Sequence, residues 1–225
     1  MPELNIGMGS TMVMATVFAF VSLAGILLLS YKLDSSLSTN TIILMGVIFS
    51  MFASSLSSLV ITFAGDRVKT ITFWTMGSLQ NAGYQSAAVM AVSLLIFGGI
   101  IMAKAEELNA FAIGEDNARS IGVNVRAVKL AILVSSSVMI GICVAVSGTI
   151  GFVGLVTPHM VRLITGPNHK RLLPASVFGG AIFLMLSDLA ARVLLNPREL
   201  PIGVVTSMIG SVVFVYIFCN ARKRG

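Results

Sequence analysis

Charged residues are missing from long stretches of this chain. The uncharged windows are residues 4–31, 35–65, 70–103, 130–161, 172–187 and 200–221. A helix needs about 20 apolar residues to cross the hydrocarbon core of a bilayer. Most windows reach that length, and the fifth reaches it if its helix also includes Asp188 and Arg192. The pattern therefore predicts a chain that crosses a membrane several times.

These windows and the turns between them predict an all-α, polytopic membrane helix bundle with about seven crossings. Residues 166–169 are typical of a turn, because glycine frees the backbone and proline and asparagine favour turns. Residues 196–201 form a second turn, since Pro197 and Pro201 break helices. The predicted crossings are 11–31, 39–63, 84–103, 127–146, a short one ending near 165, 172–195 and 202–220.

Two segments are predicted to lie at the membrane surface. Residues 70–80 are semi-polar and too short to span, which favours an interfacial helix. Residues 104–126 are the most polar part of the chain, and we expect one or two short helices there, broken near Gly114. Gly114, Ala118 and Gly122 recur every four residues, a spacing that would let a surface helix dock into a groove on another protein. A solvated loop is the alternative interpretation of this segment.

Composition supports the membrane interpretation. Of the 225 residues, 56% are hydrophobic and 11% are charged, and the mean hydropathy is +0.95. Soluble domains carry about 25% charged residues, and a soluble chain this apolar would expose large apolar patches. Residues 1–225 are therefore predicted to form a single transmembrane domain. The net charge of +6 does not indicate a nucleic-acid partner, because the basic residues lie between apolar runs.

The distribution of basic residues predicts the orientation. Cytoplasmic loops of membrane proteins carry an excess of Lys and Arg. We therefore expect residues 104–126 and the C-terminus in the cytoplasm, and the turns at 64–83, 147–154 and 196–201 on the outer side. The basic residues assigned to the cytoplasm are Lys32, Lys104, Arg119, Arg126, Lys129, Lys170, Arg171, Arg222, Lys223 and Arg224.

No catalytic set stands out in the sequence. The two histidines, His159 and His169, lack further metal ligands nearby, and they are interpreted as a helix-start hydrogen bonder and a loop residue. Motifs for a nucleophile, for phosphate binding and for zinc are not found, so no catalytic residue, metal site or cofactor is predicted. Asp188 and Arg192 share one helix face, either as a pair near a helix end or with Arg192 reaching an acidic partner outside.

Several blocks of sequence resemble one family. They are FWTMGSL at 73–79, LNA with GEDNARSIGV in 108–123, GFVGLVTPH at 151–159, GPNHKRLLP at 166–174, DLAAR at 188–192 and PRELPIGVVT at 197–206. Together they resemble the signature of the FecCD-type permeases, over roughly residues 40–220.

The resemblance implies a function. Members of this family import iron–siderophore complexes, haem or cobalamin across the bacterial inner membrane, and they carry ten transmembrane helices, of which this chain matches the fourth to the tenth. A second permease copy, ATP-binding cassette ATPase subunits and an extracytoplasmic substrate-binding protein are the implied partners. ATP hydrolysis would lie on the ATPase, so the chain is expected to be a permease and not an enzyme.

The resemblance also assigns residues to roles. Coupling to the ATPase is expected of Glu106, Leu108, Ala110, Gly114, Glu115, Ala118, Arg119 and Gly122. Docking of the binding protein is expected of Arg192 and Arg198. A structural or pathway role is expected of Gly151, Gly154, Pro158, His159, Asp188 and Pro201.

Other functions stay open at this point. An ion-coupled secondary transporter would need ionisable residues near mid-membrane, for which only Asp188 and Arg192 qualify. An intramembrane enzyme would need a catalytic pair around His159, and a non-functional permease fragment is the third alternative. The sequence selects no single chelate, although a pathway rich in Met and Ser is expected.

Overall fold

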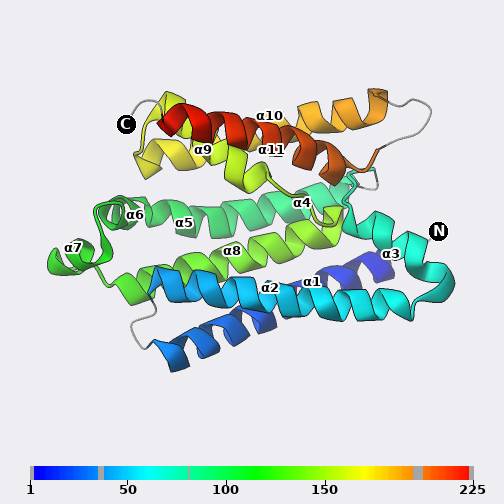
Figure 1. Ribbon diagram of the computed structural model, residues 1–225, viewed down its shortest axis with the longest axis horizontal. Coiled ribbons are helices and arrows are strands. Elements are labelled where there is room, and N and C mark those ends of the chain that lie inside the picture. Colours follow the sequence, from blue (N-terminus) through cyan, green and yellow to red (C-terminus); the bar gives the residue numbers. More distant parts are fainter. Residues whose placement is uncertain (1–2, 35–37, 81, 195–199, 223–225) are drawn as a thin grey trace. The chain divides into compact units, whose positions relative to one another are not determined.

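The computed structural model describes residues 3–34, 38–80, 82–194 and 200–222, and every regular element in these ranges is helical (Figure 1). The predicted all-α fold is therefore confirmed. The chain divides into two compact units. Unit 1 comprises residues 1–72, 84–101 and 124–146, and unit 2 comprises 73–83, 102–123 and 147–225. That the whole chain acts as a single domain stays a prediction.

Unit 1 is built from long apolar helices. They are α1 (Glu3–Leu33), α2 (Thr39–Thr62), α4 (Tyr84–Ser93) and α8 (Val125–Ser147), and a π-helical turn (Leu94–Gly98) continues α4 into α5 (Gly99–Ala103). The Ser38 hydroxyl caps α2 by accepting a hydrogen bond from the Thr41 amide at 3.4 Å. Gly141 lets α8 approach α1 closely, since a Cβ there would lie 3.1 Å from Thr16 Cα. Small residues at helix crossings are typical of membrane proteins.

Unit 2 contains shorter helices and most of the turns. Its helices are α6 (Ala105–Phe111), α7 (Glu115–Ser120), α9 (Val153–Thr165), α10 (His169–Val193) and α11 (Ile202–Arg222). α9 and α10 pack tightly, because a Cβ at Gly179 would lie 2.9 Å from Val161 Cγ2. The end of α3 (Val68–Thr75), which follows a 3-10 turn at Gly65–Arg67, also belongs to this unit. The predicted helix at 70–80 thus ends at Thr75.

Five helices in the described ranges are long and apolar enough to cross a membrane. They are Val13–Leu33, Thr39–Thr62, Tyr84–Ala103, Val125–Ser147 and His169–Val193. These confirm five of the seven predicted crossings as helices of spanning length. α9 has 13 residues, about 20 Å at the rise of an α-helix, which is short of the hydrocarbon core. α11 has 21 residues, and Ile202–Val215 is the apolar stretch within its fully described part.

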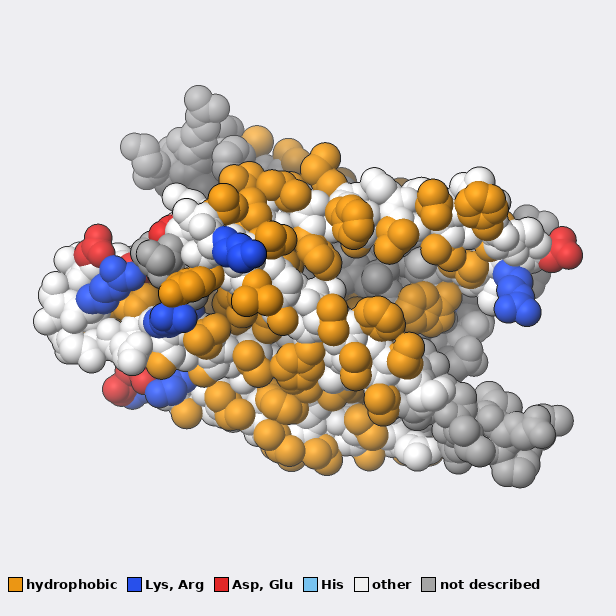
Figure 2. Space-filling view, turned by 90° about the horizontal axis from the view of Figure 1, so that it is seen from below, with side chains coloured by type: hydrophobic (Ala, Val, Ile, Leu, Met, Phe, Trp, Pro, Cys, Tyr) orange, Lys and Arg blue, Asp and Glu red, His pale blue; other side chains and the backbone are white. Residues whose placement is uncertain are grey.

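Large hydrophobic side chains cover much of the exposed surface (Figure 2). Phe18, Phe52 and Phe178 are 60%, 65% and 72% exposed. Water would penalise this exposure, whereas lipid is a solvent for such side chains. The chain is therefore a multi-pass membrane protein.

Candidate functional site

The polar segment consists of two short helices, α6 and α7, separated by Gly114. Gly114 has φ 119° and Gly122, just after α7, has φ 89°, a region that only glycine enters freely. Two hydrogen bonds close the segment behind α7, from Gly122 N to Arg119 O at 3.0 Å and from Val123 N to Ala118 O at 3.0 Å. The predicted pair of helices broken near Gly114 is confirmed.

The expected stripe of small residues on one surface helix is wrong. Ala118 is fully buried, and Gly114 and Gly122 lie outside α7 at its two ends. The four-residue spacing has meaning only on a continuous helix, and the positive φ angles interrupt it. Within the segment, Ile113 and Ile121 are instead 73% and 71% exposed. These two apolar side chains were missed in the sequence, although large aliphatic residues beside glycines in a polar stretch were a usable signal.

Charged side chains of the segment pair locally. Lys104 Nζ lies 2.9 Å from Glu107 Oε1, and its hydrogen bond lowers the pKa of Glu107. Arg119 lies 3.6 Å from Asp116, whose side chain is almost fully exposed. Glu106 is exposed and Glu115 is half-buried. Leu108 and Ala110 are half-buried, so the exposed surface of the segment mixes charges with the two isoleucines.

The segment is bonded to the start of α10. Asn109 Oδ1 accepts hydrogen bonds from the His169 backbone N and from His169 Nδ1, both at 2.8 Å. The Asn109 amide donates to Asn168 Oδ1 at 3.2 Å, and Lys170 forms an ion pair with Glu106. His169 is therefore the first residue of a long helix and not a loop residue. Sequence analysis assigned no role to Asn109, because its partners lie about 60 positions away.

A second cluster, which we call the turn cluster, joins three non-helical segments of unit 2. They are residues 76–80, 148–152 and 200–201, with the start of α11. Ser78 N donates to Ser147 O at 2.8 Å, Gly203 N donates to Met76 O at 3.1 Å, and the Thr149 hydroxyl donates to Thr75 O. These bonds satisfy backbone groups that would be costly to leave unpaired inside a membrane protein.

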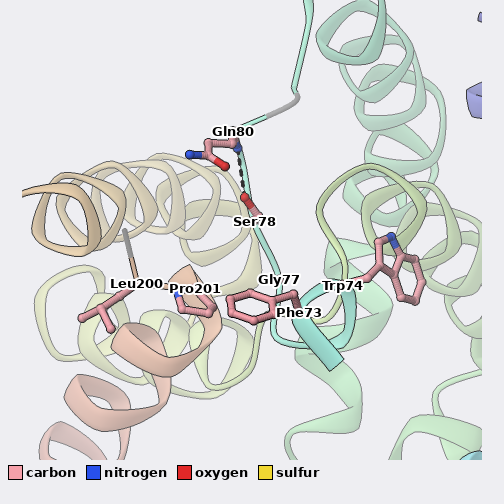
Figure 3. A pocket seen from close by; sticks show the side chains of 7 residues that line it. All are labelled: Phe73, Trp74, Gly77, Ser78, Gln80, Leu200 and Pro201. Atoms are coloured by element: carbon pink, nitrogen blue, oxygen red, sulfur yellow. Dashed lines mark hydrogen bonds between the residues drawn. The ribbon is translucent and has the colours of Figure 1, made fainter. Parts of the chain in front are cut away.

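Three glycines make the turn cluster possible. A Cβ at Gly77 would lie 2.8 Å from Thr149 O, and one at Gly148 or Gly203 would overlap the carbonyl oxygen of Trp74 or Met76. Beside the cluster lies a cavity of about 340 Å³, where Phe73, Gly77 and Pro201 lie close together (Figure 3). Its lining residues are Phe73, Trp74, Gly77, Ser78, Gln80, Leu200 and Pro201.

Several residues with a predicted structural role have identifiable environments. A Cβ added at Gly151 would lie 3.5 Å from Ser207 Oγ, whereas a Cβ at Gly154 would meet no atom of the described residues within 4 Å. Pro158 lies inside α9. His159 Nδ1 is 3.0 Å from Leu155 O, and its ring meets Phe214 edge-on at 6.1 Å. His159 is thus a hydrogen-bonding residue as predicted, but it lies in the middle of α9 and not at a helix start, because α9 already begins at Val153.

Phe152 is a functional candidate that sequence analysis missed. It is the one non-glycine residue with positive φ (66°) among the described residues, and it precedes α9. Its side chain fills the space at Gly210 of α11, where an added Cβ would overlap Phe152 Cβ and lie 2.9 Å from its Cγ. Left-handed backbone costs an ordinary residue about 1–2 kcal/mol, so the packing against α11 offsets this strain.

Of the two interpretations of Asp188 and Arg192, the structure shows the ion pair near a helix end. Arg192 Nε lies 2.8 Å from Asp188 Oδ2, one turn apart near the end of α10. The second predicted docking residue, Arg198, lies outside the described residues. The role of the pair in docking stays a prediction.

Unit 1 contains a groove between α1 and α2 of about 700 Å³. Serines and a methionine follow one another along its α2 side, and none of the described residues of α2 is buried. The residues that line it are Ile26, Ile43, Gly46, Val47, Ser50, Met51, Ser54 and Ser55. The lining holds three serines and one methionine, and the expected pathway rich in Met and Ser stays a prediction.

Apolar helices of spanning length, a turn cluster closed by backbone contacts and a polar two-helix segment define a polytopic membrane protein. Residues 3–220 match the family model of the FecCD transport family. The chain belongs to this family, which confirms the resemblance inferred from its sequence blocks.

Known proteins resemble the chain over most of its length. It is 40% identical over 214 residues to the uncharacterized ABC transporter permease protein YvrB of Bacillus subtilis, which covers 95% of this chain and 60% of that protein. It is 39% identical over 168 residues to the hemin transport system permease protein HmuU of Yersinia pestis, which covers 73% and 50%. The chain thus spans 60% or less of the length of these two relatives.

The fold also resembles a solved structure, an inward-facing conformation of a metal-chelate type ABC transporter. The TM-score is 0.82 at 33% sequence identity, over 91% of this chain and 65% of that chain. The fold is therefore that of an ABC transporter permease.

Proposed function

We propose that the chain forms the membrane-spanning permease of a binding-protein-dependent ABC importer for a bulky metal chelate, in a bacterial inner membrane. The family match over residues 3–220 carries this proposal. The names of similar proteins support the substrate class, since they mention hemin and a metal-chelate type transporter. A second permease copy, a partner ATPase and an extracytoplasmic binding protein complete the proposed assembly.

In this proposal residues 104–126 contact the ATPase. The segment exposes Ile113, Ile121 and Asp116, and exposed apolar side chains in a charged segment are typical of a protein interface. The α1–α2 groove forms part of the substrate pathway, because hydroxyl and thioether groups suit an amphipathic chelate without binding it tightly. Alternating access would follow from rigid movements of the helices.

ATP-dependent uptake in proteoliposomes tests the proposed function. The importer is assembled from the permease, its ATPase and its binding protein, and uptake of hemin and of a ferric siderophore is measured. We expect uptake of one of these probes with ATP and none with a non-hydrolysable analogue. Uptake driven by an ion gradient without ATP would instead indicate a secondary transporter.

Gly122→Trp is expected to uncouple the ATPase from transport. A Cβ at Gly122 meets no atom of the described residues within 4 Å, so the indole would project outward into the proposed interface. We expect ATP-driven uptake to fall about tenfold, in line with the cost of an overpacked contact. Gly122→Ala is the matched control, because alanine carries the backbone strain of a Cβ at φ 89° without the bulk of the indole. Equal uptake by both variants would contradict the coupling role of the segment.

Arg192→Glu is expected to weaken docking of the binding protein while ATPase docking is unchanged. The substitution removes the arginine proposed to pair with an acidic group of the binding protein. It also places a second carboxylate on the helix face that already carries Asp188. Reversal of a docking charge reduces affinity by about 30-fold or more. Surface plasmon resonance on the purified complex measures the affinity for the binding protein. Asp188→Asn keeps the arginine and should dock normally, and a similar loss in both variants would mean that the ion pair only holds the helix end.

A further inference from the structure

The first turn of α10 is capped by a residue from another part of the chain. The leading amide groups of a helix have no partner inside that helix. Asn168 Oδ1 accepts from Lys170 N at 3.0 Å, which is an ordinary N-cap, but the His169 amide bonds to Asn109 of α6. Asn109 therefore completes the cap of α10 from the polar segment, and its bond to the His169 ring fixes the relative orientation.

The division of the chain into compact units is consistent with this link. The helix before the polar segment belongs to unit 1 as far as Ile101, and α8 after it belongs to unit 1 from Asn124. Residues 102–123 nevertheless belong to unit 2, together with α9, α10 and α11. Contacts between residues far apart in the sequence place this segment in unit 2, and α6 packs on α10. The segment is thus part of the same compact unit as α10 despite its covalent neighbours.

We infer that Asn109 joins the polar segment to α10 as one rigid body, so that movement of the ATPase passes to α10 through this residue. This inference rests on the proposed function. Asn109 is a positioning residue: its side chain makes three hydrogen bonds to Asn168 and His169, and the exposed ion pair between Glu106 and Lys170 adds a second link on the same side. The opposite end of α10 carries Asp188 and Arg192. One helix therefore connects the proposed ATPase contact with the proposed docking end.

A reversible cross-link tests whether the joint transmits movement. Cys143 and Cys219 are first replaced by serine, and Asn109→Cys is combined with His169→Cys in the assembled importer. With both thiols reduced, we expect uptake per ATP hydrolysed, measured with whichever of hemin and the ferric siderophore the wild-type importer transports, to fall about tenfold while ATPase activity persists, because three hydrogen bonds are lost. A short bifunctional thiol reagent that bridges the two positions is expected to restore uptake. Normal uptake in the reduced state, or no recovery after bridging, would overturn the inference.

Single substitutions separate the joint from a general structural role. Asn109→Asp keeps the oxygen that accepts from His169 but loses the donation to Asn168 Oδ1, so it is expected to retain part of the coupling, whereas Asn109→Leu loses all three bonds. Asn117→Leu is the matched control, since the Asn117 amide donates to Ile113 O within the segment at 2.9 Å. An equal loss of uptake per ATP in Asn109→Leu and Asn117→Leu would overturn the inference.

Hydrogen exchange of the purified chain gives a readout that does not depend on transport. We expect Asn109→Leu to speed amide exchange in residues 169–172 about tenfold, while Asn117→Leu leaves these amides unchanged. Unchanged exchange in Asn109→Leu would overturn the inference that Asn109 joins the polar segment to α10, even if the importer transports its substrate. If the wild-type assembly shows no ATP-driven uptake, the proposed function fails, and faster exchange would still establish the link between α6 and α10.

Discussion

Gly203→Ala is expected to destabilise the protein by about 3 kcal/mol, the upper range for overpacking a rigid site. The added Cβ would overlap Met76 O and lie 3.1 Å from Thr149 O, and both are backbone atoms that no rotamer change can move. The same Met76 oxygen accepts the hydrogen bond from Gly203 N, so any shift that relieves the clash also breaks this bond. The apparent melting temperature of the detergent-purified protein measures the effect.

Whether Gly203→Ala lowers or raises the melting temperature tests the contact between residues 76 and 203. Gly203 lies in the first turn of α11, where helix propensity alone gives no reason for alanine to destabilise the protein. Gly154→Ala in α9 is the control, because its Cβ meets no atom of the described residues within 4 Å, and we expect an equal or higher melting temperature. A stabilising Gly203→Ala would mean that residues 76 and 203 are not in contact in the protein.

Gly210→Ala is expected to cost about 2 kcal/mol because of Phe152. The new Cβ would overlap the root of the Phe152 side chain, which cannot rotate away. Phe152→Gly removes both the obstacle and the strained φ of 66°, although it also loses the aromatic packing. In the Phe152→Gly background we therefore expect Gly210→Ala to have almost no further effect.

A double-mutant cycle on melting temperature measures this coupling. Strong non-additivity would show that Phe152 and Gly210 form one contact between the start of α9 and the middle of α11. Additive losses would contradict that contact, and the strained backbone at Phe152 would then need another explanation.

The membrane-spanning helices could be predicted from the sequence because lipid imposes a simple local condition. About 20 uncharged residues must follow one another, and this can be read along the chain without knowing any tertiary contact. The same reasoning located the polar segment and its break at Gly114, since glycine there interrupts two short helical patterns. The helix α9 was harder to predict from the sequence, because its 13 residues fall below the length that a membrane crossing requires.

The contacts within the candidate sites could not be predicted in this way. Asn109 and His169 are 60 positions apart, and Thr149 and Thr75 are 74 apart, so no local pattern links them. The interpretation of Ala118 failed for a related reason. It assumed helical periodicity across glycines whose positive φ angles end the helix. Residue spacing reports which side chains share a face only while the backbone stays regular.

The turn cluster has a practical consequence for mutagenesis. Its cross-links are carried mainly by main-chain atoms, from Ser78 N to Ser147 O and from Gly203 N to Met76 O. Truncating the surrounding side chains to alanine leaves those atoms in place, so a conventional alanine scan would report these loops as tolerant. The sensitive positions are those where alanine is an addition, at residues 77, 148 and 203. A screen for essential residues of this permease therefore has to enlarge side chains as well as remove them.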